Sequence, residues 1–469
     1  MAPDVQQTVI ERLARWIIET PPAAIAEAQL AQARLLTLDT IGCGIAGWAE
    51  QLARECVAEV AERGGAAQCQ IIGSRLRTNL ASAVFGNGVL VRVLDLNDYI
   101  IGDAAKGGDM GGHPSDNIPV ALAAGERFGC NGRDVLAAIV IGYELYGRLK
   151  GLMDRHAAWD GITASGAVAA AMAGRLIRLD HARMSHALGL ALARSVTPAA
   201  VRSGQLSAAK SISNALIAET GTGAALLAAR GITGPLALFE QKHGLQQVFV
   251  RAEGFERLTR QLGADAVILG AHVKAYPCLA TGQSIVAAAL KMHAQLGGDV
   301  GWLANARIVL ADYPTIIRQQ NDAARSDPRS REAADHSFPF LAAVALIDGA
   351  FGLAQFEGER WNDTSVRGVM ARLTFANDPT WAVTAPDAYP CRIEATTTDG
   401  RQLTASIAYP PGFSRGSIAA GEVLAKFDAV TAPHLAAPAR RAIVDAVMGL
   451  DASADLGAVV RAIGVAVEA

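Results

Sequence analysis

Seven segments in the first half of the chain carry apolar residues at three- and four-residue intervals, the spacing that places them on one face of an α-helix. They are 29–48, 79–93, 117–128, 132–149, 162–176, 181–193 and 210–230. Hydrophobic residues make up 51% of the 469-residue chain but aromatic residues only 5%, and alanine dominates the apolar fraction. Such small side chains favour a core of closely packed helices rather than an aromatic-rich sheet. The sequence therefore predicts a mainly α protein with a large all-helical domain.

The pattern changes after about residue 265. Short β-branched or alternating runs typical of strands occur at 266–269, 306–313, 366–373, 392–397 and 402–408, with helical spacing at 282–296 and 338–348. Asp399 and Gly400 form the Asp-Gly pair typical of a tight hairpin between the last two runs. Helical spacing returns after residue 418, which suggests that the tail completes the first domain. We therefore expect a helical domain made of 1–265 and 415–469, with an inserted, smaller α+β lid domain at 266–414.

Charge and cysteine content argue against several kinds of partner. The chain has 42 Lys and Arg against 45 Asp and Glu and contains no basic run, so no nucleic-acid partner is expected. No segment reads as a signal peptide or a membrane span, so no membrane partner is expected either. The six cysteines include no C-x-x-C pair, which predicts reduced thiols in a cytoplasmic protein rather than a metal site.

A G-x-G-x-x-G pattern occurs at 42–47, but within a segment of helical periodicity. A dinucleotide-binding turn instead follows a buried strand and opens a helix. We therefore interpret these glycines as points where helices approach closely, or as an interruption of a helix. The glycine-rich loop at 102–112 lacks the G-x-x-x-x-G-K-[ST] pattern of a phosphate loop, and the sequence predicts neither a cofactor nor a metal ion.

The densest polar cluster begins with DLNDY at 95–99 and continues, after the glycine-rich loop, with His113. An acid such as Asp95 and an imidazole brought together at a helix end can orient or tune a proton-transfer group. The structural alternative is that Ser115 or Asp116 caps the next helix, while Asp95 pairs with a neighbouring cation.

Three further positions combine charge with a helix end or a domain junction. Lys210 opens an Ala-rich helix with no acid three or four residues on, so it suits an anion, or else it is solvated. Lys274 lies at the entry to the smaller domain, where clefts form. Asp335 or Ser337 is interpreted as a helix cap, with His336 holding the preceding loop.

Nine sequence blocks carry a resemblance that covers nearly the whole chain. They are LLTLDTIGCGIAG, FGNGVLVRVLDLND, GGHPSDNIPVALAAGE, GYELYGRL, GTGAALLAARGITGP, KAYPCLATGQSIVAAAL, ADHSFPFLAAVALIDG, TTTDGRQLTASIAYPPG and LAKFDAV. In this order and spacing they resemble the MmgE/PrpD family, which includes 2-methylcitrate dehydratase, cis-aconitate decarboxylase and iminodisuccinate epimerase. The resemblance implies a homodimeric, metal-independent and cofactor-independent enzyme for a small di- or tricarboxylate, with a large helical domain and an α+β lid.

The resemblance also assigns roles by position. The family's active-site aspartate corresponds to Asp95, its histidine to His113 and its helix lysine to Lys210. Its chemistry removes a proton α to a carboxylate, or CO₂ from that carbon, through an enolate-like state that needs a base and a fixed cation. We hypothesise that His113 moves the proton, Lys210 neutralises a substrate carboxylate or the enolate, and Asp95 orients or tunes His113. The implied substrate-binding residues are Asp98, Tyr99, Trp159, Lys274 and Gln283.

Several positions depart from the decarboxylase-like members of the family. Tyr99 replaces a threonine, Trp159 falls where a pocket histidine is expected, Leu279 begins the stretch that carries a further histidine, and Phe340 replaces a tyrosine. Because unpaired substrate carboxylates are costly to bury, these losses predict a smaller or more apolar substrate than cis-aconitate.

Three readings of the function follow. The leading prediction is a carbon–oxygen lyase of the dehydratase type. An epimerase, an isomerase or a decarboxylase would use nearly the same residues. A non-catalytic carboxylate binder belongs to a different class; the lost pocket groups favour it, whereas the retained Asp95, His113 and Lys210 argue against it.

Overall fold

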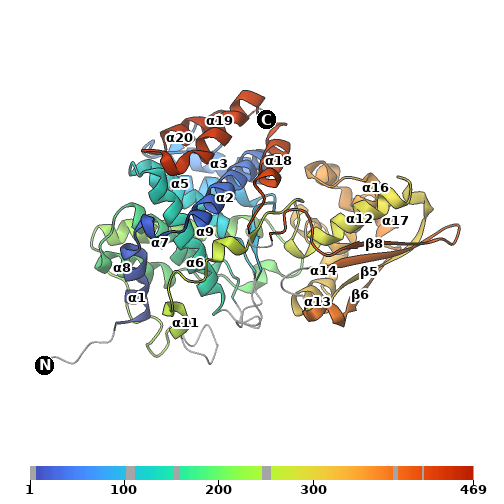
Figure 1. The fold of residues 1–469 in the computed structure, drawn as a ribbon, viewed down its shortest axis with the longest axis horizontal. Helices are drawn as coiled ribbons and strands as arrows, with labels where there is room; N and C mark the ends of the chain where they lie inside the picture. Colours follow the sequence, from blue (N-terminus) through green and yellow to red (C-terminus); the bar gives the residue numbers. More distant parts are fainter. Residues whose placement is uncertain are drawn as a thin grey trace.

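The computed structural model describes residues 7–101, 111–152, 159–245, 255–383, 389–414 and 417–467. The glycine-rich loop singled out above lies, from 102 to 110, outside the described residues. The fold is mainly α, as predicted, and Figure 1 shows a helical body beside a smaller part that contains the sheet. Within the described residues, the α-helices before residue 265 are α1 (Val9–Glu19), α2 (Glu27–Ala46), α3 (Gln51–Arg63), α4 (Leu80–Arg92), α5 (Ile118–Arg127), α6 (Gly132–Lys150), α7 (Thr163–Leu176), α8 (His181–Leu192), α9 (Ala209–Ala229) and α11 (Glu256–Thr259).

Each of the seven segments predicted as helices in the first half forms one, namely α2 and α4 to α9. Small residues let these helices approach closely, as the composition suggested. At the contact between α7 and α9, a Cβ on Gly221 would overlap the carbonyl oxygen of Gly166. The G-x-G-x-x-G pattern lies at the end of α2, where a Cβ on Gly47 would overlap the carbonyl oxygen of Leu90. The interpretation of these glycines as helix contacts is confirmed.

The main sheet has the strand order β6-β5-β7-β8, with β5 and β6 parallel and the other pairs antiparallel. Its strands are β5 (Leu303–Ala311), β6 (Leu373–Asp378), β7 (Cys391–Thr397) and β8 (Gln402–Ile407). The predicted hairpin joins β7 to β8, and Gly400 has the positive φ of 87° that this turn requires. The helices of this part are α12 (Gln283–Gln295), α13 (Pro314–Gln320), α14 (Ala323–Ser326), α15 (Arg331–Ala334), α16 (Phe338–Asp348) and α17 (Thr364–Met370).

Two predicted strands are wrong. The 366–373 segment is mostly helix α17, because Asp363 caps it through the N–H of Ser365. The buried residues Val366, Val369 and Met370 recur at helical spacing, which outweighs the β propensity of single residues. The 266–269 segment is a 3₁₀ turn at Val267–Gly270 that begins from Ala266 in the left-handed region.

The C-terminal tail packs back onto the helical body (Figure 1). Its helices are α18 (Ala420–Thr431), α19 (Ala437–Met448) and α20 (Gly457–Ile463), and α18 packs on α2, where Gly42 faces Phe427. One buried apolar cluster draws on residues 9–273 and 418–463, and a second draws on residues 278–405. The boundaries at 265 and 415 stay predictions, and residues 415 and 416 are outside the described ranges.

Two short antiparallel pairs complete the described strands. β1 (Cys69–Gln70) pairs with β2 (Arg77–Thr78), and β3 (Tyr99–Ile100) pairs with β4 (Ala271–His272). The second pair joins the acidic DLNDY segment to the stretch that leads into the sheet-containing part. It therefore positions the end of that segment next to the junction of the two parts.

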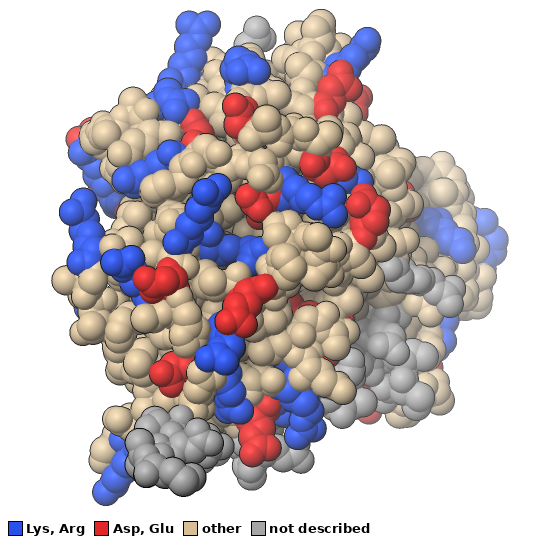
Figure 2. Space-filling model, turned by 60° about the vertical axis from the view of Figure 1, so that its left-hand side comes forward, with Lys and Arg blue, Asp and Glu red and all other residues tan. Residues whose placement is uncertain are grey.

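Among the described helices, none is by itself long and apolar enough to cross a bilayer. One bent pair, Phe338–Asp348 with Leu353–Asn362 at 116°, meets the length and composition criteria together. Figure 2 shows the face at the end of the helical body, where basic and acidic side chains are interspersed among uncharged residues.

Candidate active site

A cavity of about 460 Å³ lies where the helical body meets the sheet-containing part. Its lining comes from α4, β3 and α6 on one side and from α13 and α14 on the other. Both Asp95 and His113 line it, as do Tyr99 and Trp159. The basic side chains in the lining are Arg92, Lys150, Arg202, Arg318 and Arg325, and the acidic ones are Asp95, Asp160 and Asp322. The excess of basic groups gives the cavity the charge that a carboxylate ligand needs.

Asp95 is the centre of a buried ionic cluster. It follows the end of α4 with a φ of 50°, in the left-handed region that aspartate tolerates better than most residues. The guanidinium of Arg92 pairs with its carboxylate, and the Lys274 ammonium lies 2.6 Å from Oδ1 and 2.9 Å from the Asp95 carbonyl oxygen. Burial alone would raise the pKa of Asp95, but Arg92, Lys210 and Lys274 hold that pKa well below its usual range. Asp95 is therefore an anion that orders three cations.

Lys210 joins Asp95 to Asp335. Its ammonium lies 3.2 Å from Asp95 Oδ2 and 3.2 Å from both carboxylate oxygens of Asp335, and the side chain is only 1% exposed. The alternative of a solvated lysine is therefore wrong, because this cation already has two buried partners. The hypothesis that it meets a substrate carboxylate directly needs revision, since Lys210 lies behind the cavity wall rather than in its lining.

The sequence interpretation missed Asp335 and His336. Asp335 does not cap α16; Ser337 does, by accepting the N–H of Phe340. Asp335 instead pairs with Lys210, with Arg331 at 3.1 Å and with the Nδ1 of His336. His336 lines the cavity with its Nε2 3.5 Å from Asp95 Oδ2, and burial lowers its pKa to about 3.

We call this group, formed by Arg92, Asp95, Lys210, Lys274, Asp335 and His336, the Asp95 cluster. Its Asp95, Asp335 and His336 ligand atoms lie within 4.8 Å of one another, which is close enough to hold a metal ion. However, the Lys210 ammonium contacts both carboxylates. A cation there competes with a metal for the same oxygens, so this donor set fits an internal ion pair better than a metal site.

His113 is the group best placed to take a proton. Its Nδ1 lies 2.6 Å from the carbonyl oxygen of Asp98, and a carbonyl oxygen only accepts, so Nδ1 carries the hydrogen. This tautomer leaves the lone pair on Nε2, which is 4.0 Å from Asp95 Oδ1 at the cavity wall. Burial, together with the cations Arg92 and Lys274, holds the pKa of His113 well below its usual range. His113 is therefore a neutral base with one nitrogen available.

Asp98 lies behind His113 rather than in the cavity lining. Its Oδ2 accepts the hydroxyl of Tyr143 at 2.7 Å, and its Oδ1 accepts the N–H of Ser115 at 3.2 Å. Asp98 is fully buried, and its backbone carbonyl oxygen fixes the tautomer of His113. Burial raises the pKa of Asp98 to about 7.

Replacing Asp98 by asparagine tests this buried acid. The folded protein holds a proton on Asp98 up to about pH 7, whereas the unfolded chain releases it near pH 4. The folded state thus binds more protons between these values, and Asp98 costs stability progressively as the pH rises from 4 to 7. Because asparagine stays neutral, the free energy of unfolding of Asp98→Asn should rise relative to that of the wild-type protein by up to about 4 kcal/mol over this range. Urea unfolding of both proteins at pH 5 and pH 8 measures the difference.

The matched control is Asp445→Asn, an exposed position on α19. Its free energy of unfolding should differ from that of the wild-type protein by the same amount at both pH values. If the difference for Asp98→Asn is also the same at both pH values, Asp98 is ionised throughout and its burial does not hold the proton.

The other predicted substrate-binding residues divide into two groups. Tyr99 and Trp159 line the cavity, as does Leu279. Lys274 is fully buried, and its ammonium donates a hydrogen bond to the Asp95 carboxylate. Gln283 is also fully buried and is absent from the cavity lining; its amide bonds the main chain at Ala275, Tyr276 and Cys278, so it holds the Lys274 segment in place.

Two further sequence interpretations are corrected by these contacts. Neither Ser115 nor Asp116 caps the following helix through its side chain; Asp116 accepts the amide of Asn97 at 2.7 Å. Phe340 belongs to the apolar core of the sheet-containing part, and it is absent from the cavity lining. The cavity is also not simply apolar, since Tyr99 and Trp159 share it with the five basic side chains.

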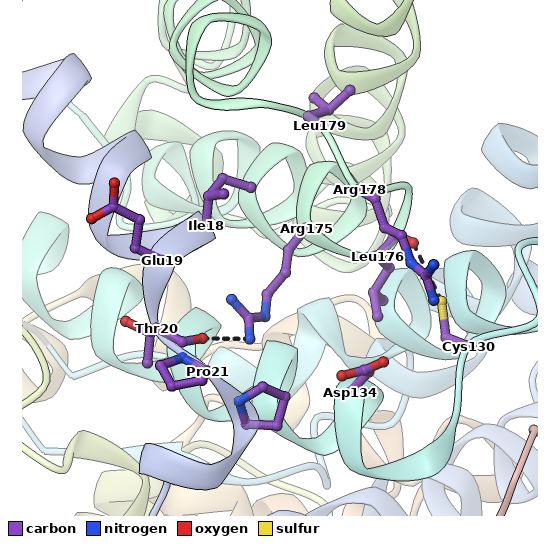
Figure 3. Close-up of a pocket in the computed structure, with 11 residues that line it drawn as sticks. Ile18, Glu19, Thr20, Pro21, Cys130, Asp134, Arg175, Leu176, Arg178 and Leu179 are labelled. Carbon is purple, nitrogen blue, oxygen red and sulfur yellow. Dashed lines mark hydrogen bonds between the residues drawn. The ribbon is translucent and has the colours of Figure 1, made fainter.

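A second cavity, of about 310 Å³, lies between the ends of α1 and α7 (Figure 3). Arg175 points across it and bonds the carbonyl oxygen of Thr20 at 2.7 Å, while the thiol of Cys130 bonds that of Leu176 at 3.3 Å. Main-chain carbonyls thus engage these two side chains. No histidine lines it, so it lacks the base found at the first cavity.

Comparison with known proteins identifies relatives over nearly the whole chain. The MmgE/PrpD N-terminal domain matches residues 11–258, and the MmgE/PrpD C-terminal domain matches residues 276–451. The cis-aconitate decarboxylase-like protein oryM of Aspergillus oryzae is 24% identical over 477 residues, which cover 96% of this chain and 95% of that protein. A probable 2-methylcitrate dehydratase of Saccharomyces cerevisiae is 31% identical over 156 residues, 30% of this chain and 28% of that protein. The two domains together span most of the chain, which therefore belongs to the MmgE/PrpD family.

Proposed function

We propose that the protein is a cofactor-independent lyase of the dehydratase type, which removes a proton α to a carboxylate of a small di- or tricarboxylate. The observation that carries the proposal is the free Nε2 of a neutral His113 beside a buried cation cluster. The family membership and the names of the two relatives support a lyase in general terms.

The proposed reaction begins at His113. Its Nε2 takes the α-proton, and the electron pair of the broken C–H bond becomes an enolate on the substrate carboxylate. Negative charge then grows next to Arg92, Lys210 and Lys274, whose positions are already set by Asp95. Preorganised cations stabilise such charge without having to reorganise during the reaction. Lys210 therefore acts through the field of the Asp95 cluster rather than by direct contact.

Loss of the β-hydroxyl needs a proton donor, and Tyr99 fits this role. It lines the cavity, and its hydroxyl has no hydrogen-bond partner within the described ranges. Burial raises the pKa of Tyr99, so the phenol keeps its proton at neutral pH. In the proposed step the C–O bond breaks, the departing oxygen takes the Tyr99 proton to form water, and the protonated His113 later restores it.

We also propose that the α+β part at 266–414 acts as a lid, since α13 and α14 supply one wall of the cavity. A homodimer and a cytoplasmic location are proposed with it, on the family resemblance and on the six free cysteines.

The experiment is incubation with a panel of hydroxy-, unsaturated and amino-dicarboxylates in deuterated water, followed by mass spectrometry. An alkene product supports the dehydratase. Deuterium in an otherwise unchanged substrate favours the epimerase, and release of CO₂ favours the decarboxylase that the Aspergillus relative's name suggests. No exchange and no product with any compound would contradict an enzymatic function of this kind.

Tyr99→Phe separates proton removal from elimination. Without the phenol, we expect the rate of alkene formation to fall about 10²-fold or more, while deuterium exchange at the α-carbon continues. Tyr409→Phe, at an exposed position, is the control and should keep both rates. Equal loss of exchange and elimination in Tyr99→Phe would remove Tyr99 from the role of acid.

A further inference from the structure

The wall of the cavity formed by α13 and α14 presents two arginines that the proposed reaction does not use. Arg318 lies on α13 and Arg325 on α14, and both line the cavity with the Asp95 cluster. The nearest acid on this wall is Asp322, so the two arginines outnumber the carboxylates beside them.

Arg325 is buried without a full set of partners. It is 8% exposed, its Nε lies 3.4 Å from Asp322 Oδ2, and its Nη2 lies 3.5 Å from the carbonyl oxygen of Arg202. Both contacts are long for charge-assisted hydrogen bonds. Its Nη1 is shielded from solvent and has no acceptor in the described part of the chain. A buried, unpaired donor of this kind is costly, and a ligand oxygen in the cavity would satisfy it.

Arg318 adds a second cation at the same place. It is exposed, and no hydrogen bond or ion pair with the described residues engages it. The two positive charges repel each other. The pKa of Arg325 is lowered mainly by burial, and the Arg318 charge lowers it further. On the same helix, Gln319 accepts the hydroxyl of Thr281 at 2.6 Å, which ties α13 to the segment after Lys274. Two like charges held together in this way are stabilised by an anion between them.

We propose that Arg318 and Arg325 form a second carboxylate subsite, which binds the carboxylate farthest from the reacting carbon. The inference rests on the proposed function for the identity of the reacting end, which lies at His113. It assigns Arg318 and Arg325 to the second carboxylate of the di- or tricarboxylate proposed above, because a planar guanidinium matches a carboxylate in geometry and charge. A monocarboxylate bound at His113 would leave Arg325 Nη1 without an acceptor among the described residues.

The test is isothermal titration of the full chain with butyrate, succinate and tricarballylate, which carry one, two and three carboxylates. Arg325→Gln should weaken the binding of succinate and tricarballylate about 10- to 100-fold and leave butyrate unchanged. Arg318→Gln should weaken the same two ligands several-fold, because its side chain is exposed. Arg329→Gln is the control, since this exposed arginine pairs with Asp327 and does not line the cavity.

Unchanged succinate affinity in Arg318→Gln and Arg325→Gln would overturn the subsite, as would failure of the wild-type protein to prefer succinate to butyrate. If Arg325→Gln does not fold, as judged by circular dichroism, Arg318→Gln decides the question, because no described contact depends on its side chain. The deuterium-exchange panel is run on the same samples. Succinate binding that depends on the arginines, without exchange in any compound, supports the subsite and contradicts the proposed function. Deuterium exchange together with succinate binding that does not depend on the arginines supports the proposed function and contradicts the subsite.

Discussion

Replacing His113 by glutamine is expected to lower turnover about 10²- to 10⁴-fold, the range typical for loss of a general base. Glutamine keeps a donor that can reach the carbonyl oxygen of Asp98, but it has no nitrogen that takes a proton at neutral pH. The measurement is deuterium exchange and product formation with the compound that the panel identifies. Because the side chain is similar in length and polarity, the melting temperature should stay close to that of the wild-type protein.

The pH profile of the wild-type enzyme gives an independent check on His113. The base must be unprotonated to act, and burial with Arg92 and Lys274 nearby lowers its pKa. The acidic limb of kcat/KM should therefore fall below pH 6.5, the ordinary value for histidine. His434→Gln, a half-buried position after α18, is the matched control and should keep full activity. Near-normal turnover in His113→Gln would assign the base to another residue.

Replacing Lys210 by methionine is expected to destabilise the protein by about 3–5 kcal/mol, because it removes one partner of a buried ion pair. Asp95 keeps Arg92 and Lys274, whereas Asp335 keeps Arg331 and His336. Both carboxylates would stay buried with less positive charge around them. Activity should fall as well, since the cation field at the cavity wall weakens. Urea unfolding measures the free-energy change.

A double-mutant cycle with Asp335→Asn isolates the Lys210–Asp335 pair. The double variant should be more stable than the sum of the two single changes predicts, because it removes both charges together. Lys291→Met, on the exposed face of α12, controls for loss of a lysine and should change stability by less than about 0.5 kcal/mol. Additive effects in the cycle would show that the two side chains do not stabilise each other.

The helices could be predicted from sequence because their signal is local. Apolar spacing within each segment already identifies the buried face, and the bounds of α6 and α16 agree with prediction to within one residue. A local signal could have corrected the wrong strand prediction at 366–373, since Asp363 followed by apolar residues at helical spacing is typical of a helix start. By contrast, no local pattern announces that 266–269 begins from a left-handed residue.

The residues of the candidate site also fall into two groups, those that the sequence indicated and those that it did not. Resemblance to a family pointed to Asp95, His113 and Lys210, and the structure brings all three together. It did not point to Asp335 and His336, whose short polar motif also reads as a helix cap. Nor does anything near Arg325 in the sequence indicate that its Nη1 lacks an acceptor, because that depends on which distant segments cover it.

Sequence alone suffices for a mainly α fold, for the family and for three residues of the candidate site, since helical periodicity and ordered motifs can be recognised without coordinates. The state of those residues is a property of the tertiary structure. Lys210 lies 115 positions from Asp95 in the chain, and Lys274 lies 179 positions away, yet both contact its carboxylate. Only folding buries these charges together, lowers the pKa of His113 and directs its Nδ1 hydrogen to Asp98. Burial and long-range pairing decide protonation, and neither is encoded in any single stretch of the chain.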